Sequence, residues 1–159
     1  MSALLQVENL SVSFRQEGRL TPAVRNISFS LNRGETVALV GESGSGKSVS
    51  ALSTVSLLGD SAVVSGSVTY DGQQMVGADQ GLLRQVRGND ISFIFQEPMT
   101  SLNPLHTIER QLSESLTLHQ GLVGAKARAL ILELLTKVGI REPETRLGAY
   151  PHQLSGGQR

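Results

Sequence analysis

One segment of the sequence, residues 41–48, has residue types and spacing suited to binding phosphate. It reads GESGSGKS and fits the pattern G-x-x-x-x-G-K-[ST] at every fixed position. Small residues let successive backbone N–H groups converge on phosphate oxygens, a lysine adds positive charge, and the final hydroxyl can bind Mg²⁺. A chance match in a chain of this length has a probability of about 1%. We therefore predict that a nucleoside triphosphate binds here, at Gly41, Glu42, Ser43, Gly44, Ser45, Gly46, Lys47, Ser48 and Val49.

The first part of the chain has the alternation of apolar and polar residues that is typical of an antiparallel sheet. Residues 5–14 alternate with a one-residue slip, residues 27–31 repeat the pattern, and residues 66–75 contain an Asp-Gly pair that predicts a hairpin turn. Residues 37–40 and 91–95 are nearly continuous apolar runs, which indicate strands buried in a parallel sheet. The phosphate-binding segment would thus follow a buried strand.

Helical spacing of apolar residues predicts helices over residues 47–58, 105–116 and 123–138, and we expect the apolar stripes of the last two to form a core. Strands first and helices later favour a mixed α/β core followed by a helical lobe. We assign residues 1–97 to an antiparallel β-subdomain plus the first part of the α/β core. Residues 98–159 are assigned to a helical subdomain.

Composition excludes several classes of function. Lys and Arg together number 14, as do Asp and Glu, so there is no basic surplus for sequence-independent nucleic-acid binding. The absence of Cys excludes a disulfide scaffold, a thiolate zinc site and a thiol nucleophile. No apolar run approaches the length of a bilayer span, and the N-terminus has no secretory-signal pattern. We expect a cytoplasmic-type domain.

Further segments narrow the class of nucleotide-binding protein. Residues 154–158 read LSGGQ, residues 95–98 read FQEP, and Phe14 is an aromatic residue on the first predicted strand. With the phosphate-binding segment, and in this order, they resemble the signature, Q-loop and aromatic A-loop of ATP-binding cassette (ABC) ATPases. The resemblance spans the whole chain. It implies an α/β, P-loop NTPase core with an N-terminal antiparallel β-subdomain and a C-terminal helical subdomain.

The resemblance also implies roles for individual residues. Phe14 would stack on the adenine of ATP, while Lys47 and Gln96 would be catalytic and Ser48 and Gln96 would bind Mg²⁺. In this family two cassettes enclose two ATP molecules head to tail. The signature would meet the ATP of the opposite cassette through Ser155, Gly156, Gly157 and Gln158.

Two stretches resemble the ATPases of dipeptide and oligopeptide importers: FQEPMTSLNP at 95–104 and YPHQLS at 150–155. Some of those ATPases carry two cassettes in one chain, including the microcin C-type importers, and this chain resembles a first cassette. The resemblance implies ATP hydrolysis coupled to uptake of peptides or similar small solutes. The implied partners are membrane-spanning permease subunits, a second cassette and, indirectly, an extracytoplasmic solute-binding protein. The implied location is peripheral, on the cytoplasmic face of the inner or plasma membrane.

Other interpretations stay open at this point. A DNA-repair or chromosome-organising ATPase shares these signatures, although such cassettes are interrupted by coiled coils or zinc modules. A nucleotide-binding module without hydrolysis is another possibility. Phe14 could be a core residue, Gln96 a strand cap, and the glycines of the signature an ordinary turn. We expect Arg84 and Arg87 on a solvated helix face, and we assign no catalytic role to His106, His119 and His152.

One part of the family pattern is missing from the sequence. No run of four apolar residues is followed by Asp-Glu, where the family has an Asp for Mg²⁺ and a Glu that polarises the attacking water. We therefore expect these residues to be part of a longer cassette protein, truncated before the Walker B strand and unable to turn over ATP alone. The strands at 37–40 and 91–95 would then have unpaired edges in an incomplete sheet.

Overall fold

The structure, a computed structural model, describes residues 3–95 and 101–159, which fall into two compact units. The first is Met1–Ser92 and the second is Phe93–Arg159. The predicted domain boundary between residues 97 and 98 lies outside the described residues. Each unit has a core of its own.

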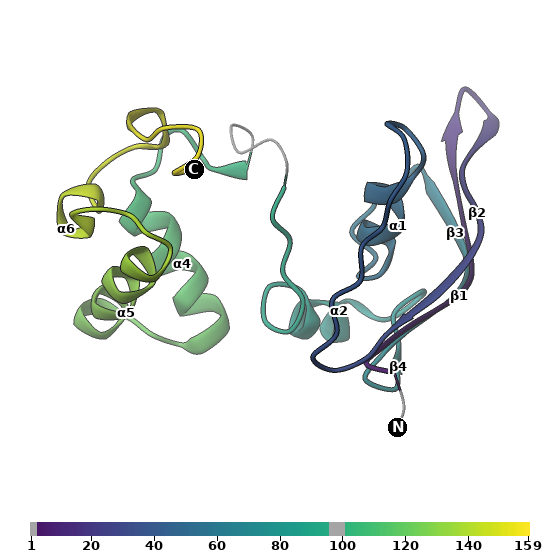
Figure 1. The fold of residues 1–159 in the computed structure, drawn as a ribbon, viewed down its shortest axis with the longest axis horizontal. Coiled ribbons are helices and arrows are strands. Elements are labelled where there is room, and N and C mark those ends of the chain that lie inside the picture. The colour runs from purple at the N-terminus through teal and green to yellow at the C-terminus, as the bar shows by residue number, and fades with distance from the viewer. Residues whose placement is uncertain (1–2, 96–100) are drawn as a thin grey trace. The chain divides into compact units, whose positions relative to one another are not determined.

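An antiparallel sheet, visible in Figure 1, forms the main body of the first unit, as the alternating sequence predicts. Its strands follow the order β2-β1-β3-β4, and every described pairing is antiparallel. The strands are β1 (Leu5–Gln16), β2 (Arg19–Leu31), β3 (Ala62–Tyr70) and β4 (Gln73–Gln74). Strand β1 therefore pairs on one side with β2, the next strand in the sequence, and on the other side with β3, which lies much later in the sequence.

The slip in the apolar pattern of β1 corresponds to a bulge. The β1–β2 register shifts between Val7 and Leu10, and Asn9 takes the left-handed conformation with φ of 51°. Asn tolerates this conformation better than most residues. Because the bulge absorbs one residue, Val7, Leu10 and Val12 are all buried although their spacing is irregular.

The hairpin predicted within residues 66–75 is confirmed. Asp71 and Gly72 join β3 to β4, and both have positive φ, 44° and 80°. Positive φ at both central residues is the requirement of a type I′ turn, which matches the twist of the flanking strands.

Helix α1 (Lys47–Ser53) is shorter than the predicted helix over 47–58. Its own hydroxyls bond to carbonyls one turn back, Ser53 Oγ to Val49 O at 2.7 Å and Thr54 Oγ1 to Ala51 O at 2.7 Å. Such bonds compete with the helical ladder. Ser56 then adopts φ of 52°, which directs the chain out of the helix.

The two predicted buried strands are wrong for this structure. Residues 37–40 form no strand, and Val40 is 92% exposed; residues 91–95 form only one isolated bridge, Arg87 to Ile91. A strand needs a hydrogen-bonded neighbour, and within residues 3–95 and 101–159 no segment pairs along either run. Most apolar side chains of the two runs are accordingly exposed, Ile94 fully so, whereas Ile91 and Phe93 are half-buried.

Arg87 does not lie on a solvated helix face, contrary to the sequence prediction. It follows α2 (Gln80–Val86), and its guanidinium donates from Nε to Val55 O at 2.9 Å and from Nη2 to Ser56 O at 2.5 Å. Arg84 is exposed, as predicted, and among the described residues its side chain bonds to Gln80 O of its own helix. Arg87 thus ties the chain after α1 to the end of α2.

We expect Arg87→Ala to lower the free energy of unfolding by about 1.5–3 kcal/mol, because two part-buried carbonyls lose a charged donor. The matched control is Arg84→Ala, which should change stability by less than about 0.5 kcal/mol. Urea unfolding of the full-length protein measures both. Equal effects of the two substitutions would contradict the role assigned to Arg87.

The second unit is helical, and it contains α4 (Ile108–Gln120), α5 (Gly124–Lys137), α6 (Pro143–Arg146) and the short 3₁₀ helix η1 (Pro151–Gln153). The core predicted from the apolar stripes is confirmed in part: Ile108, Leu116, Ile131 and Leu135 are buried in one cluster. Figure 1 shows α4 and α5 side by side, and the two helices are in contact.

Four residues of the predicted stripes are exposed instead of buried: Leu134 on α5, and Leu105, Val123 and Val138 at helix ends. Leu105 precedes α4, because Thr107 caps the helix through its hydroxyl, which accepts from Arg110 N at 3.3 Å. Val123 and Val138 flank α5, at its N-cap and C-cap positions. Among the helices of the described residues, none is both long enough and apolar enough to cross a bilayer.

Candidate nucleotide-binding site

The phosphate-binding segment forms a loop that ends directly at the start of α1. Gly44 and Gly46 have φ of 80° and 90°, in the region that glycine adopts without strain. A Cβ at Gly46 would also lie 2.7 Å from the carbonyl oxygen of Ala23 and 3.0 Å from Val24 Cγ2. The loop therefore passes so close to β2 that only glycine fits at this position.

Lys47, the first residue of α1, folds its side chain back under the loop. Its Nζ donates to Gly41 O at 2.8 Å and Glu42 O at 2.6 Å, and lies 3.4 Å from Ser45 Oγ. The ammonium charge is thus held in the curve of the loop. Ser48 follows on the first turn of the helix with its side chain exposed.

A groove runs beside the loop within the first unit. Lys47 and Ser45 line one part of it, and Val24 and Ile27 of β2 line another. The wall of the groove therefore contains both polar and apolar side chains, and Arg25 of β2 adds a second positive charge to it. This combination suits a ligand that carries phosphates on one end and an apolar face on the other.

Phe14, the predicted adenine platform, lies on β1 opposite Thr21 of β2 and Ala62 of β3. Its side chain is half-buried. Half-burial is compatible with stacking on a ligand and with packing on the sheet, so the role of Phe14 stays a prediction.

We expect Phe14→Ala to weaken nucleotide binding by about 0.5–1.5 kcal/mol, the free energy of an aromatic stacking contact. Phe14→Tyr should bind nucleotide as the parent protein does. Nucleotide titration beside thermal melting tests this in the full-length protein. A loss of about 3–5 kcal/mol in stability with unchanged affinity would instead identify Phe14 as a core residue.

The predicted signature lies in the second unit and forms a single helical turn. Ser155 N donates to Gln158 Oε1 at 2.9 Å, and Gln158 N donates to Ser155 Oγ at 3.3 Å. This reciprocal pair is a capping box. Leu154 is buried just before it, while Gly156 and Gly157 are exposed, and a Cβ on either would meet nothing within 4 Å.

The cap gives Gln158 a structural role that the sequence analysis missed. The signal was present, since Ser-x-x-Gln at 155–158 is the capping-box pattern. The side chain of Gln158 accepts from Ser155 N, its backbone N–H donates to the Ser155 hydroxyl, and the two glycines between them are exposed to solvent. Glycine backbone at a capped turn is suited to contact with an anion.

Of the two predicted Mg²⁺ ligands, Gln96 and Ser48, the structure describes only Ser48. Gln96 lies outside the described residues, so its predicted roles in catalysis and Mg²⁺ binding stay predictions. Across the described ranges, no group of three or more His, Asp or Glu side chains is placed to hold a metal ion. Ser48, the other predicted Mg²⁺ ligand, is among the described residues, and its role in metal binding also stays a prediction. The loop and the signature lie in different units.

Comparison with known proteins agrees with these motifs. The sequence model of the ABC transporter family matches residues 24–159. The chain is 61% identical over 158 residues to the peptidoglycan transport ATP-binding protein YejF of Agrobacterium fabrum, covering 98% of this chain and 29% of that protein. It is 46% identical over 160 residues to the oligopeptide transport ATP-binding protein OppD of Mycobacterium tuberculosis, covering 100% and 26%. The chain thus spans less than a third of the length of these relatives.

Solved structures of cassettes share the fold. The dimeric structure of MJ0796, a bacterial ABC transporter cassette, superposes with a TM-score of 0.80 at 27% identity, covering 97% of this chain and 64% of that chain. A post-hydrolysis dimer of the same cassette, bound to ADP and Pi, has a TM-score of 0.78 at 25% identity and the same coverage. The predicted fold class, a P-loop NTPase core of the ABC type, is confirmed. The match of the family model over most of the sequence shows that the chain belongs to the ABC transporter family.

Proposed function

We propose that this chain is the ATP-binding part of an ABC importer subunit that hydrolyses ATP and couples hydrolysis to uptake of peptides or similar small solutes. The observation that carries the proposal is the loop curled around the Lys47 ammonium and followed directly by α1. The capped signature turn at Ser155 supports it, because an ABC ATPase needs both elements.

In this proposal Lys47 supplies positive charge to the β- and γ-phosphates of ATP, and the loop N–H groups bind their oxygens. The residues present fit a triphosphate, because the lysine Nζ already lies within the curve of the loop. Mg²⁺, when bound, would supply positive charge that offsets the negative charge of the phosphates. Ser48 would hold the metal through its exposed hydroxyl, together with Gln96.

The signature turn would act on a second cassette. Ser155 and Gly157 would contact the γ-phosphate of ATP held by that cassette, while Gln158 keeps the serine in place. The dimeric MJ0796 cassette, which has the same fold and whose post-hydrolysis form holds ADP and Pi, supports this arrangement. The second cassette could belong to the same polypeptide or to another.

The transported solute is proposed from the names of the relatives. They are called transport proteins for peptidoglycan and oligopeptides, and a 48% identical relative from Pectobacterium atrosepticum is called a glutathione import ATP-binding protein. These solutes share peptide bonds. We therefore propose permease subunits and a peptide-binding extracytoplasmic protein as partners, at the cytoplasmic face of the membrane. No named relative supports a DNA-repair function.

Uptake of labelled di- to pentapeptides into proteoliposomes tests the proposal, with the full-length protein, its permease subunits and its binding protein. ATP supplied on the side of the membrane that carries the ATPase should drive peptide uptake. A non-hydrolysable ATP analogue on the same side should not. If the transporter hydrolyses ATP but takes up no peptide, the proposal that peptides are the transported solute is wrong. Nucleotide binding without hydrolysis would instead leave the non-hydrolysing module as the function.

A further inference from the structure

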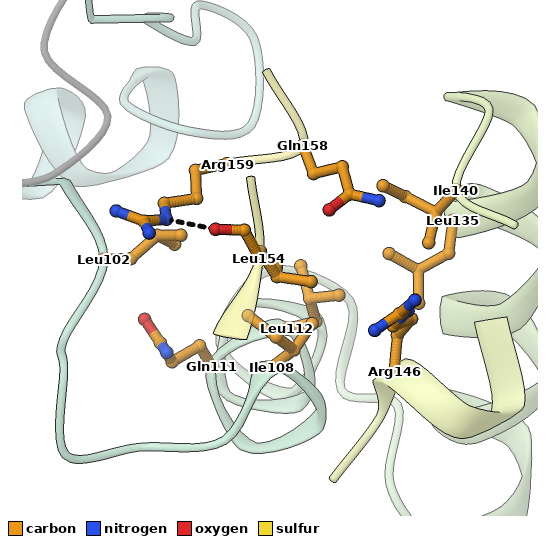
Figure 2. A pocket seen from close by; sticks show the side chains of 10 residues that line it. All are labelled: Leu102, Ile108, Gln111, Leu112, Leu135, Ile140, Arg146, Leu154, Gln158 and Arg159. Carbon is orange, nitrogen blue, oxygen red and sulfur yellow. Dashed lines mark hydrogen bonds between the residues drawn. The ribbon is translucent and has the colours of Figure 1, made fainter. Parts of the chain in front are cut away.

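Gln111, near the start of α4, holds the loop that precedes this helix, residues 101–107. Its Oε1 accepts from Asn103 N at 2.9 Å, and its Nε2 donates to Asn103 O at 3.1 Å and to His106 O at 2.9 Å. The single carboxamide of Gln111 thus pairs with both the N–H and the C=O of Asn103, as the backbone of a neighbouring β-strand would. Figure 2 shows Gln111 beside α4, near the chain segment that carries Leu102.

Internal bonds shape this loop but do not attach it to the helix body. Asn103 Oδ1 accepts from Leu105 N at 2.9 Å, which makes a local turn. Leu105 is 81% exposed and contributes little packing. The apolar attachment is Leu102, which lines a small cavity with Leu112 and Leu154 (Figure 2). The Gln111 carboxamide is a polar attachment, and it reaches the part of the loop beyond Leu102.

The start of α4 is in turn bonded to the segment that leads to the signature. Ile108 N donates to Ala149 O at 2.9 Å, and Glu109 N donates to Leu147 O at 3.0 Å. Two N–H groups that a helix start leaves unpaired are therefore paired with this segment. Leu154, the residue before Ser155, packs in the same cavity as Leu102. The loop, the start of α4 and the signature segment thus form one connected body.

The loop begins directly after residues 96–100, which include Gln96. We propose that Gln111 is a positioning residue: its carboxamide makes the 101–107 loop and the signature turn at Ser155 move as one body, and so couples ATP hydrolysis to transport. This inference rests on the proposed function above. In this proposal Gln111 does not contact nucleotide. Replacing it should therefore change the ratio of solute transported to ATP hydrolysed, and not the affinity for nucleotide.

Hydrogen exchange of the full-length protein tests the structural half of the proposal. In Gln111→Leu the loop loses these three bonds and a longer fourth one, from Nε2 to Thr107 O at 3.5 Å. Amides in peptides covering 101–106 should therefore exchange at least about tenfold faster. Peptides covering α5 should keep their rates. Gln120→Leu, on the last turn of the same helix, is the matched control and should change neither region. Unchanged exchange at 101–106 in Gln111→Leu would overturn the proposal.

The second part of the proposal, that Gln111 couples ATP hydrolysis to transport, is tested in the reconstituted transporter. We expect Gln111→Leu to retain nucleotide affinity and basal ATP hydrolysis within about twofold, but to lower solute transported per ATP by about tenfold, within the usual range of coupling free energies. Gln111→Glu keeps the acceptor for Asn103 N but loses both donors, and should show an intermediate loss. It replaces the leucine variant if that variant does not fold.

Two outcomes separate this inference from the proposed function. If the parent protein shows no ATP-driven uptake, the proposed function fails, whatever Gln111 does to hydrogen exchange. If the parent protein transports and both Gln111 variants transport with an unchanged ratio of solute to ATP, the positioning role fails alone. An equal fall in nucleotide affinity, basal hydrolysis and transport would indicate a general structural role and would also overturn it.

Discussion

Replacing Lys47 with alanine in the full-length protein is expected to lower ATP hydrolysis by at least about 100-fold and to abolish ATP-driven uptake. The ammonium lies within the phosphate loop, bonded to Gly41 O and Glu42 O, so its loss removes the positive charge that would stabilise the transferring phosphoryl group. Lys47 is not a core residue, and the melting temperature should therefore change little. A phosphate-release assay and thermal melting measure the two quantities.

Lys126→Ala is the matched control, because Lys126 is an exposed lysine on α5. It should hydrolyse ATP and transport as the parent protein does. A stable Lys47→Ala protein with normal transport would be incompatible with the nucleotide site proposed here. A protein that no longer folds would show instead that the bonds from Lys47 to the loop are needed for stability.

The second large effect is expected for Gly46→Ala, through the position of the whole loop. A Cβ at Gly46 would lie 2.7 Å from the carbonyl oxygen of Ala23, so either the loop or β2 must move. The backbone conformation, with φ of 90°, adds about 1–2 kcal/mol for a residue that has a Cβ. We expect a total loss of about 2–4 kcal/mol in stability and nucleotide binding too weak to measure at millimolar concentration.

Gly44→Ala separates the two causes. Gly44 has a similar φ of 80°, but a Cβ there would meet nothing within 4 Å. It should therefore lose only the conformational part, about 1–2 kcal/mol, and keep measurable nucleotide binding. Urea unfolding and nucleotide titration compare the variants. Equal losses in both would show that the close approach of Gly46 to β2 is unimportant.

Features set by short stretches of sequence could be predicted. The phosphate loop, the Asp-Gly turn and the slip in β1 depend on residues that are adjacent in the chain. The slip could be recognised, although the bulge at Asn9 that causes it could not. The spacing of Glu133 and Lys137, four residues apart in a predicted helix, also indicates an ion pair, and the two side chains lie 2.6 Å apart on α5.

Features set by tertiary contacts could not be predicted. The roles of Arg87 and Gln111 depend on backbone carbonyls that lie far from them in sequence or in a loop without periodicity. Nothing in their local sequence distinguishes them from the exposed Arg84 and Gln120. Residues 37–40 show the reverse case, because their composition suits a strand but no described segment supplies the hydrogen bonds.

The register of β1 has a consequence for synthesis on the ribosome. Leu5 faces Leu31 on one side and Tyr70 on the other, so the strand cannot complete its pairing with β3 until residue 70 has emerged. Until then the β1–β2 hairpin exposes an unpaired edge, and two-stranded hairpins are only marginally stable. The helical unit needs only contacts between nearby elements and should fold quickly once made. A pause in translation between β2 and β3 would therefore favour aggregation, whereas a pause after β3 would not.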